Sequence, residues 1–150
     1  MEPDLVASRI AGIIKAIESL MPEYLADPLD LQIAQGNVAV CIIDANGNVY
    51  GRIFSGDGNK LRQRESYRVA WTKASQVWIT GMKTFAYEKL VFTGQIDAGK
   101  FGIIAPDFIG WEGGQPLSLD SDTRISVGFS GFRGTSDLAI VERALKLTAG

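Results

Sequence analysis

A tight hairpin constrains the fold of this chain more than any other feature of its sequence. Residues 37–44 are almost wholly apolar and β-branched, which is typical of a central strand. Asn46-Gly47 follows, and this pair tolerates the positive φ angles that a short turn requires. Residues 49–55 then supply the returning strand. Strands joined by so short a turn run antiparallel, so the sequence predicts an antiparallel sheet.

Apolar residues at helical spacing predict the elements that cover this sheet. No linker, repeat or low-complexity tract divides the chain, so we expect one α+β domain over residues 1–150. Pro22, Asp27 and Pro28 mark the end of the first helix and a loop. The expected elements are helices over 5–21, 62–82, about 84–92 and 136–148, short strands over 116–119 and 124–132, and a short strand or extended run over 101–105.

The last helix carries two apolar stripes. One contains Leu138, Val141, Leu145 and Thr148, and the other contains Ile140, Ala144 and Leu147. A helix that packs on a single sheet face needs only one such stripe. The pattern therefore predicts a contact between subunits on this helix.

Charge and composition limit the partners and the compartment. The net charge is −2 at pH 7, which offers no global attraction for nucleic acid or an anionic membrane. The N-terminus has no apolar signal segment, and no run approaches the ~20 apolar residues that a membrane span needs. We expect a soluble, cytoplasmic protein. Cys41 is the only cysteine, so no internal disulfide forms, and its apolar strand predicts a buried side chain.

Histidine is absent from the chain. Ser-His-Asp and Cys-His catalysis within one chain are therefore excluded, and the commonest zinc and haem ligand is missing. Acid–base chemistry would have to use Asp, Glu, Lys or Tyr. The aspartates show no helical ligand spacing, so no metal site is predicted.

Four motifs, in this order, connect the chain with a known family. They are Val38-Ala39-Val40 with Asp44 and Gly47 in the first hairpin, Lys73-Ala74 in the second long helix, Gly113-Gly114-Gln115-Pro116-Leu117, and Ile125 to Gly131 followed by Asp137. In them the chain resembles the GlcG/HbpS-like family, also called the haem-degrading-domain or DUF336 family, which includes the C-terminal domain of PduO-type proteins. The resemblance extends from about residue 5 to 147.

The resemblance implies a profilin-like α-β-α sandwich around a five-stranded antiparallel sheet, and a symmetric homo-oligomer. It also implies binding of haem, a cobalamin-related molecule or another small ligand. Haem ligation through histidine cannot apply to this chain. Tyr67, Tyr87, Met82 and Cys41 could ligate iron, although each residue type more often packs in a core. The cofactor therefore stays unassigned, with haem one candidate.

A carboxylate beside paired glycines is the first candidate for chemistry. Glu112 lies between Trp111 and Gly113-Gly114, where the backbone can approach a ligand closely. Desolvation beside the indole would raise the pKa of Glu112 toward general acid–base use. The alternative is a solvated loop residue, or an ion pair with Arg124, Arg133 or Lys100.

The second long helix carries basic candidates. Arg64 and Arg68 are one helical turn apart and could hold a ligand carboxylate, or could simply be exposed. If Lys73 is buried beside Trp71, its pKa would fall and permit base or Schiff-base chemistry. The alternative is a surface lysine whose ammonium reaches solvent.

Three functions remain open from the sequence. The first is a homo-oligomer that binds haem, a tetrapyrrole-like molecule or an aromatic acid. The second is a cofactor-free lyase, isomerase or hydrolase in which Glu112 is the general acid–base and Lys73 its partner. The third is an assembly module without a ligand. In the binding hypothesis, the ligand contacts are Arg64, Tyr67, Arg68, Trp71, Lys73, Trp111, Gly113, Gly114 and Phe129.

Overall fold

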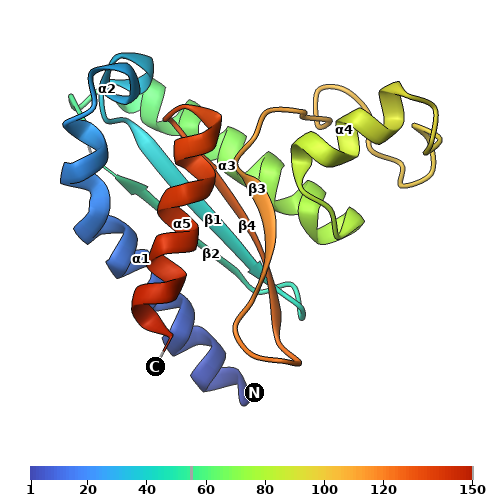
Figure 1. The fold of residues 1–150 in the computed structure, drawn as a ribbon, viewed down its shortest axis with the longest axis horizontal. Coiled ribbons are helices and arrows are strands. Elements are labelled where there is room, and N and C mark those ends of the chain that lie inside the picture. Colours follow the sequence, from blue (N-terminus) through green and yellow to red (C-terminus); the bar gives the residue numbers. More distant parts are fainter. Residues whose placement is uncertain (55, 150) are drawn as a thin grey trace.

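The computed structural model describes residues 1–54 and 56–149 and has three layers (Figure 1). Two long helices lie on one face of an antiparallel sheet and a third covers the other face. Within the described residues the sheet has four strands, in the order β2-β1-β4-β3. The elements are α1 (Pro3–Leu25), α2 (Pro28–Ala34), β1 (Val38–Asp44), β2 (Val49–Phe54), α3 (Lys60–Thr80), α4 (Thr84–Phe92), β3 (Gly114–Ser118), β4 (Arg124–Ser130) and α5 (Gly134–Thr148).

The predicted hairpin is confirmed. β1 and β2 pair antiparallel, with Val38 opposite Phe54 and Ile43 opposite Val49. The Asp44 carboxylate closes the turn by accepting the backbone N–H groups of Asn46 and Asn48, both at 2.9 Å. Gly47 has the positive φ of 84° that the turn requires. Ser55, the expected last residue of the returning strand, lies outside the described residues.

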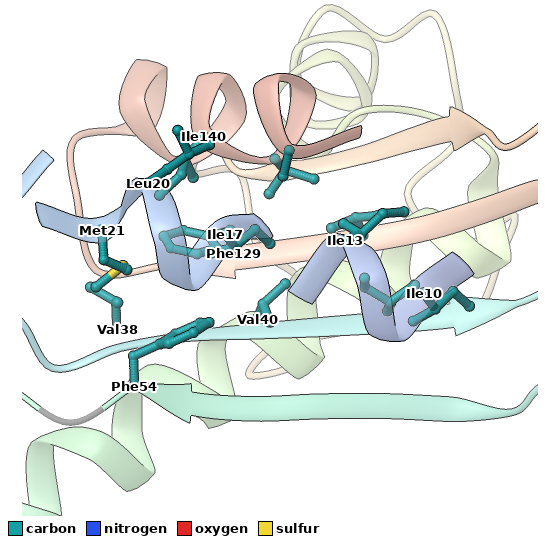
Figure 2. Packing of buried hydrophobic residues seen from close by; sticks show 14 of the residues in the cluster. Ile10, Ile13, Ile17, Leu20, Met21, Val38, Val40, Phe54, Phe129 and Ile140 are labelled. Atoms are coloured by element: carbon teal, nitrogen blue, oxygen red, sulfur yellow. The ribbon is translucent and has the colours of Figure 1, made fainter. Parts of the chain in front are cut away.

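β1 is buried on both faces, because helices cover the sheet on both sides. On one face Val40 packs with Phe129 of β4 and with Ile10, Ile13 and Ile17 of α1 (Figure 2). On the other face the side chains are mostly small, and they pack against Ala70 and Ala74 of α3. Small residues on both surfaces let α3 approach the sheet closely, which fixes the position of every α3 side chain relative to β4.

Residues 101–105 are not a strand, so the prediction of five strands is wrong for the described chain. Gly102 has a φ of 72°, which an extended strand cannot contain. Ile104 is 71% exposed instead of packing on the core. These residues belong to a long connection between α4 and β3 that extends beyond one end of the sheet (Figure 1).

The loop expected after Asp27 is instead the short helix α2. Pro28 is its first residue, where a missing N–H costs nothing. The Asp27 carboxylate caps the helix by accepting the N–H of Leu29 at 2.9 Å. Asp and Pro are common at loops and at helix starts alike, and here they begin a helix.

The two apolar stripes of α5 are accounted for within the chain, largely by contacts with α1. Ile140, Val141 and Ala144 are fully buried in the core between the sheet, α1 and α5. Only Leu147, at 65% exposure, is an exposed large apolar residue of α5. A helix that packs on both a sheet and a second helix needs a wider apolar surface, so the stripes do not require a subunit contact.

None of the described helices combines the length and the apolar character that crossing a bilayer requires.

We expect Gly128→Ala to destabilise the fold strongly. A Cβ at this position would overlap the carbonyl oxygen of Ala70 and lie 2.6 Å from the backbone N of Ala74, so α3 would have to move away from β4. Such overpacking costs about 1–3 kcal/mol or more. Urea unfolding measures the loss.

Gly12→Ala is the matched control for this substitution. Gly12 lies in α1, and its new methyl group would contact only Thr148 of α5, at 3.8 Å. Because alanine favours helix by about 1 kcal/mol over glycine, this variant should be as stable as the wild type or more stable. Equal stability of the two variants would contradict the close packing of α3 on β4.

Candidate functional site

A cavity of about 670 Å³ lies along the N-terminal half of α3. Its volume is in the range typical of sites for small organic ligands. Arg62 and Lys73 lie at the two ends of its α3 wall, about 16 Å apart along the helix at 1.5 Å per residue. α2, α4, the loop before β3 and the connection from β4 to α5 complete the walls. The α3 residues are Arg62, Glu65, Ser66, Val69 and Lys73, which share one helical face.

A buried charged pair lies at one end of the cavity. Lys73 is only 2% exposed, and its Nζ donates to the carbonyl oxygen of Phe129 at 2.9 Å. The same nitrogen is 3.4 Å from Oδ2 of Asp137. Oδ1 of Asp137 accepts the backbone N–H of Phe132 at 2.9 Å. The pair therefore joins α3 to the N-terminal turn of α5 at the end of β4.

Burial shifts the pKa of both members of the pair. It lowers the pKa of the Lys73 ammonium, against the opposing attraction of Asp137 and Glu112. It raises the pKa of Asp137 to about 8, even though Lys73 and the N–H of Phe132 favour the carboxylate. Desolvation disfavours the charged form of each group, so proton exchange between the two is easier than in water.

Gly113 lets the loop pass directly beside this pair. Its φ is 121°, in the region that side chains rarely adopt. A Cβ there would lie 2.5 Å from the Phe129 carbonyl oxygen and 2.6 Å from Nζ of Lys73. Glycine is therefore required for the backbone to approach the lysine.

Two buried side chains hold the loop that carries Trp111 and Glu112. Gln76 of α3 donates to the carbonyl of Ile109 at 2.8 Å and accepts its N–H at 2.9 Å. Thr84, the first residue of α4, donates to the carbonyl of Trp111 at 2.6 Å. The cavity wall is thus fixed by hydrogen bonds to α3 and α4.

Glu112 lies over the start of α5. A Cβ added to Gly134 would lie 2.7 Å from the Cβ of Glu112 and 3.3 Å from its Oε1. The positive end of the α5 dipole favours a carboxylate at this place. Within residues 1–54 and 56–149 no salt bridge involves Glu112, so the alternative of an ion pair with Arg124, Arg133 or Lys100 is not observed.

The structure brings part of the predicted site together. Lys73, Trp111 and Glu112 line the cavity, and the backbone of Gly113 lies directly behind Lys73. Gly114 is buried against the side chain of Thr84. Lys73 is buried as one prediction required, but beside Asp137 rather than beside Trp71, which is exposed.

Seven predicted ligand contacts lie outside this cavity. Two of them, Gly113 and Gly114, line a separate small cavity of about 210 Å³, and the other five lie outside for different reasons. Arg68 is exposed, forms an ion pair with Glu65, and lines a smaller adjoining cavity of about 290 Å³. Arg64 is exposed and does not line the cavity. Tyr67 packs on the sheet beside Gly51. Phe129 lies in the core. Trp71 is exposed on the outer surface of α3.

Sequence reasoning missed Arg62, Ile33, Phe85 and Arg133 as cavity residues. A helical-face test starting from Lys73 would have selected Val69, Ser66, Glu65 and Arg62 and rejected Arg64. Ile33 and Phe85 carry no such signal, because only the packing of α2 and α4 brings them to the cavity.

The cavity does not fit haem held through its iron. Axial ligands to haem iron are His, Cys, Met or Tyr, and none of these lines the cavity within the described residues. Cys41 is fully buried in β1. Tyr87 is fully buried too, with its ring near Phe101 and Phe108. The described residues contain no cluster of His, Cys, Asp and Glu that could hold a metal ion.

Solved structures with a similar fold were found for this chain. No family model and no curated protein matches the chain. Klebsiella pneumoniae ORFY, a DUF336 protein, has a TM-score of 0.68 at 20% identity, covering 95% of this chain and 89% of that chain. A double mutant of Streptomyces reticuli HbpS has a TM-score of 0.61 at 20% identity, covering 93% and 85%. A PduOC:heme complex has a TM-score of 0.61 at 21% identity, covering 89% and 90%.

At these identities the likeness establishes the fold alone. The α+β fold and the resemblance to GlcG/HbpS-like proteins predicted from the sequence are confirmed at that level. The neighbours do not transfer a ligand or a site residue to this chain.

We expect Lys73→Met to make stability depend more steeply on pH than in the wild type, where the lowered pKa of Lys73 offsets the raised pKa of Asp137 in the proton count of the folded state. Without the cation, the pKa of buried Asp137 rises further above the value of about 8 that burial already gives it. The unfolded carboxyl ionises at about 3.9, so above that pH the folded variant holds the extra proton. Its free energy of unfolding therefore falls as pH rises above about 4, by up to about 1.4 kcal/mol per pH unit.

Urea unfolding across this pH window is the measurement. The double variant Lys73→Met/Asp137→Asn lacks the titrating carboxyl and should lose this slope. An equally steep slope in the double variant would contradict the assignment of the effect to Asp137.

Proposed function

We propose that this protein binds a small aromatic acid in the cavity along α3. The observation that carries the proposal is an apolar cavity with polar groups at both ends, Arg62 at one and the buried Lys73–Asp137 pair at the other. Ligand sites typically combine such walls with a few placed polar groups. The carboxylate would contact Arg62, and a polar oxygen at the other end of the ligand would face Lys73.

The walls between these ends favour a ring-containing ligand. Ile33, Val69, Phe85, Trp111 and Phe132 line the cavity and come from five separate segments of the chain. Trp111 is 67% exposed, which leaves most of its indole free for stacking. Burial of aromatic surface is the main source of affinity that such walls provide.

Both polar ends keep unused hydrogen-bond donors. Within the described residues, the Arg62 guanidinium donates one hydrogen bond, to the carbonyl oxygen of Ile33 at 2.7 Å. A guanidinium has five N–H donors and can also bind a carboxylate in two-point fashion. Lys73 has three donors, of which Phe129 and Asp137 account for two. One donor at each end can therefore serve a ligand.

The PduOC:heme complex shows that a protein of this fold is found with a large planar acid. It supports a planar, carboxylate-bearing ligand here, whereas the residues of this cavity do not supply an iron ligand. An aromatic acid without a metal is a planar, carboxylate-bearing ligand that needs no iron ligand from the protein.

Arg62→Gln should weaken binding of naphthoate by about tenfold or more, because a hydrogen bond to a charged group contributes about 1.5–3 kcal/mol. Isothermal titration calorimetry measures the affinity. Arg64→Gln is the matched control, because Arg64 lies on the same turns of α3 but outside the cavity. Equal loss in both variants, or no naphthoate binding by the wild type, would contradict the proposal. Hemin added to the wild type should show no spectrum of ligated iron.

The proposal includes self-association. Large apolar side chains are exposed around the cavity, including Leu61, Phe85 and Trp111. Contiguous exposed apolar surface commonly marks a protein contact. Light scattering should give a mass that is a multiple of the 16.2 kDa chain, and a monomeric mass at micromolar concentration would contradict this part.

A further inference from the structure

Lys73 differs from every other lysine of the chain in its surroundings. It is buried and lines the cavity, whereas Lys15, Lys60, Lys83, Lys89, Lys100 and Lys146 are exposed. Its amine lies 3.4 Å from a carboxylate oxygen of Asp137, a group that can take up and return a proton at this distance. Few lysines combine a cavity position with an adjacent, equally buried acid.

We infer that Lys73 forms a reversible imine with the carbonyl group of a ligand in this cavity. The inference rests on the proposed function and narrows its ligand to an aromatic acid that carries an aldehyde or ketone at the end opposite the carboxylate. Arg62 would hold the carboxylate, and the carbonyl carbon would then face Nζ of Lys73.

The chemistry needs no group beyond the chain and the ligand. Asp137 accepts a proton from the Lys73 ammonium, and the free amine adds to the carbonyl carbon to give a carbinolamine. A new C–N bond forms, and one proton passes from the nitrogen to the carbonyl oxygen, which becomes a hydroxyl. Asp137 returns its proton to this hydroxyl, the C–O bond breaks, and one water leaves as the C=N bond of the protonated imine forms. The step is the condensation of one amine and one carbonyl, with no oxidation or reduction.

The groups around Nζ favour the free amine. Burial lowers the pKa of Lys73, while Asp137 on α5 and Glu112 in the loop before β3 oppose this shift. From β4, only the neutral carbonyl of Phe129 faces the amine. A larger fraction of Lys73 is therefore unprotonated at neutral pH than of an exposed lysine, whose pKa is about 10.4.

The Asp137 carboxyl also has a defined orientation. Its second oxygen accepts the N–H of Phe132, so the oxygen facing Lys73 is the one left for proton exchange. The backbone of Gly113 closes the opposite side of the amine. The remaining approach to Nζ is from the cavity.

The test uses formylnaphthoate, with its aldehyde and carboxylate at opposite ends of the ring system, together with cyanoborohydride. The reductant converts an imine to a stable secondary amine, and intact mass followed by peptide mapping locates it. At neutral pH we expect the Lys73 peptide to exceed each exposed-lysine peptide in modification by about tenfold for every unit by which its pKa is lowered. Unlabelled naphthoate, which has no carbonyl, should compete.

Two variants sharpen the test. Lys73→Arg keeps the positive charge beside Asp137 but cannot form an imine, so its labelling should fall to the level of the exposed lysines. Lys89→Arg removes an exposed lysine of α4 and should leave labelling at Lys73 unchanged. The wild-type peptide map decides the question even if Lys73→Arg folds poorly.

The outcomes separate this inference from the proposed function. Preferential labelling of Lys73 that naphthoate suppresses supports both. Naphthoate binding that depends on Arg62, with no excess labelling of Lys73, overturns the imine and leaves the binding function intact. Absence of naphthoate binding and uniform labelling of exposed lysines overturn both.

Discussion

The ion pair between Lys73 and Asp137 connects parts of the structure that the sheet separates. α3 covers one face of the sheet and α5 the other, and the pair meets at the end of β4. Breaking one partner of such a pair leaves a buried charge, which is far more costly than replacing both partners with apolar groups. The position of this pair determines where the loop before β3 passes and therefore where the cavity begins.

The cavity also requires that two backbone segments lie very close to their neighbours. Gly128 lets α3 lie against β4, and Gly113 lets the loop lie against Lys73. Both positions exclude a side chain for the same reason, because backbone or buried charged atoms occupy the space that a Cβ would need. The cavity is therefore a consequence of tight packing around it, and its walls are held by Gln76 and Thr84 rather than by the ligand.

The likeness to HbpS, ORFY and PduOC establishes the fold of this chain, which itself contains no histidine. A fold can host unrelated functions, so the site residues have to carry the functional argument. Here they are one lysine, two arginines and four acids around largely apolar walls: Lys73, Arg62, Arg133, Glu65, Glu88, Glu112 and Asp137. The proposed aromatic acid and the proposed imine at Lys73 both rest on this set of residues.

Local sequence patterns determined the hairpin, the long helices and the burial of Cys41, because each depends on spacing within one segment. They also selected Lys73, Trp111 and Glu112. They did not show which face of α3 turns toward the cavity, because that depends on how α2 and α4 pack beside α3. They also did not show that Phe129 belongs to the core, because that depends on the helices that cover β4. The sequence also failed to predict that residues 101–105 are not a strand and that residues 28–34 form the helix α2. Both errors concern short segments, whose structure depends on the elements that pack beside them. The sequence alone therefore determined the elements and the available chemistry. Only the tertiary structure decided which groups meet, because Lys73 and Asp137 are 64 positions apart and packing alone brings them together.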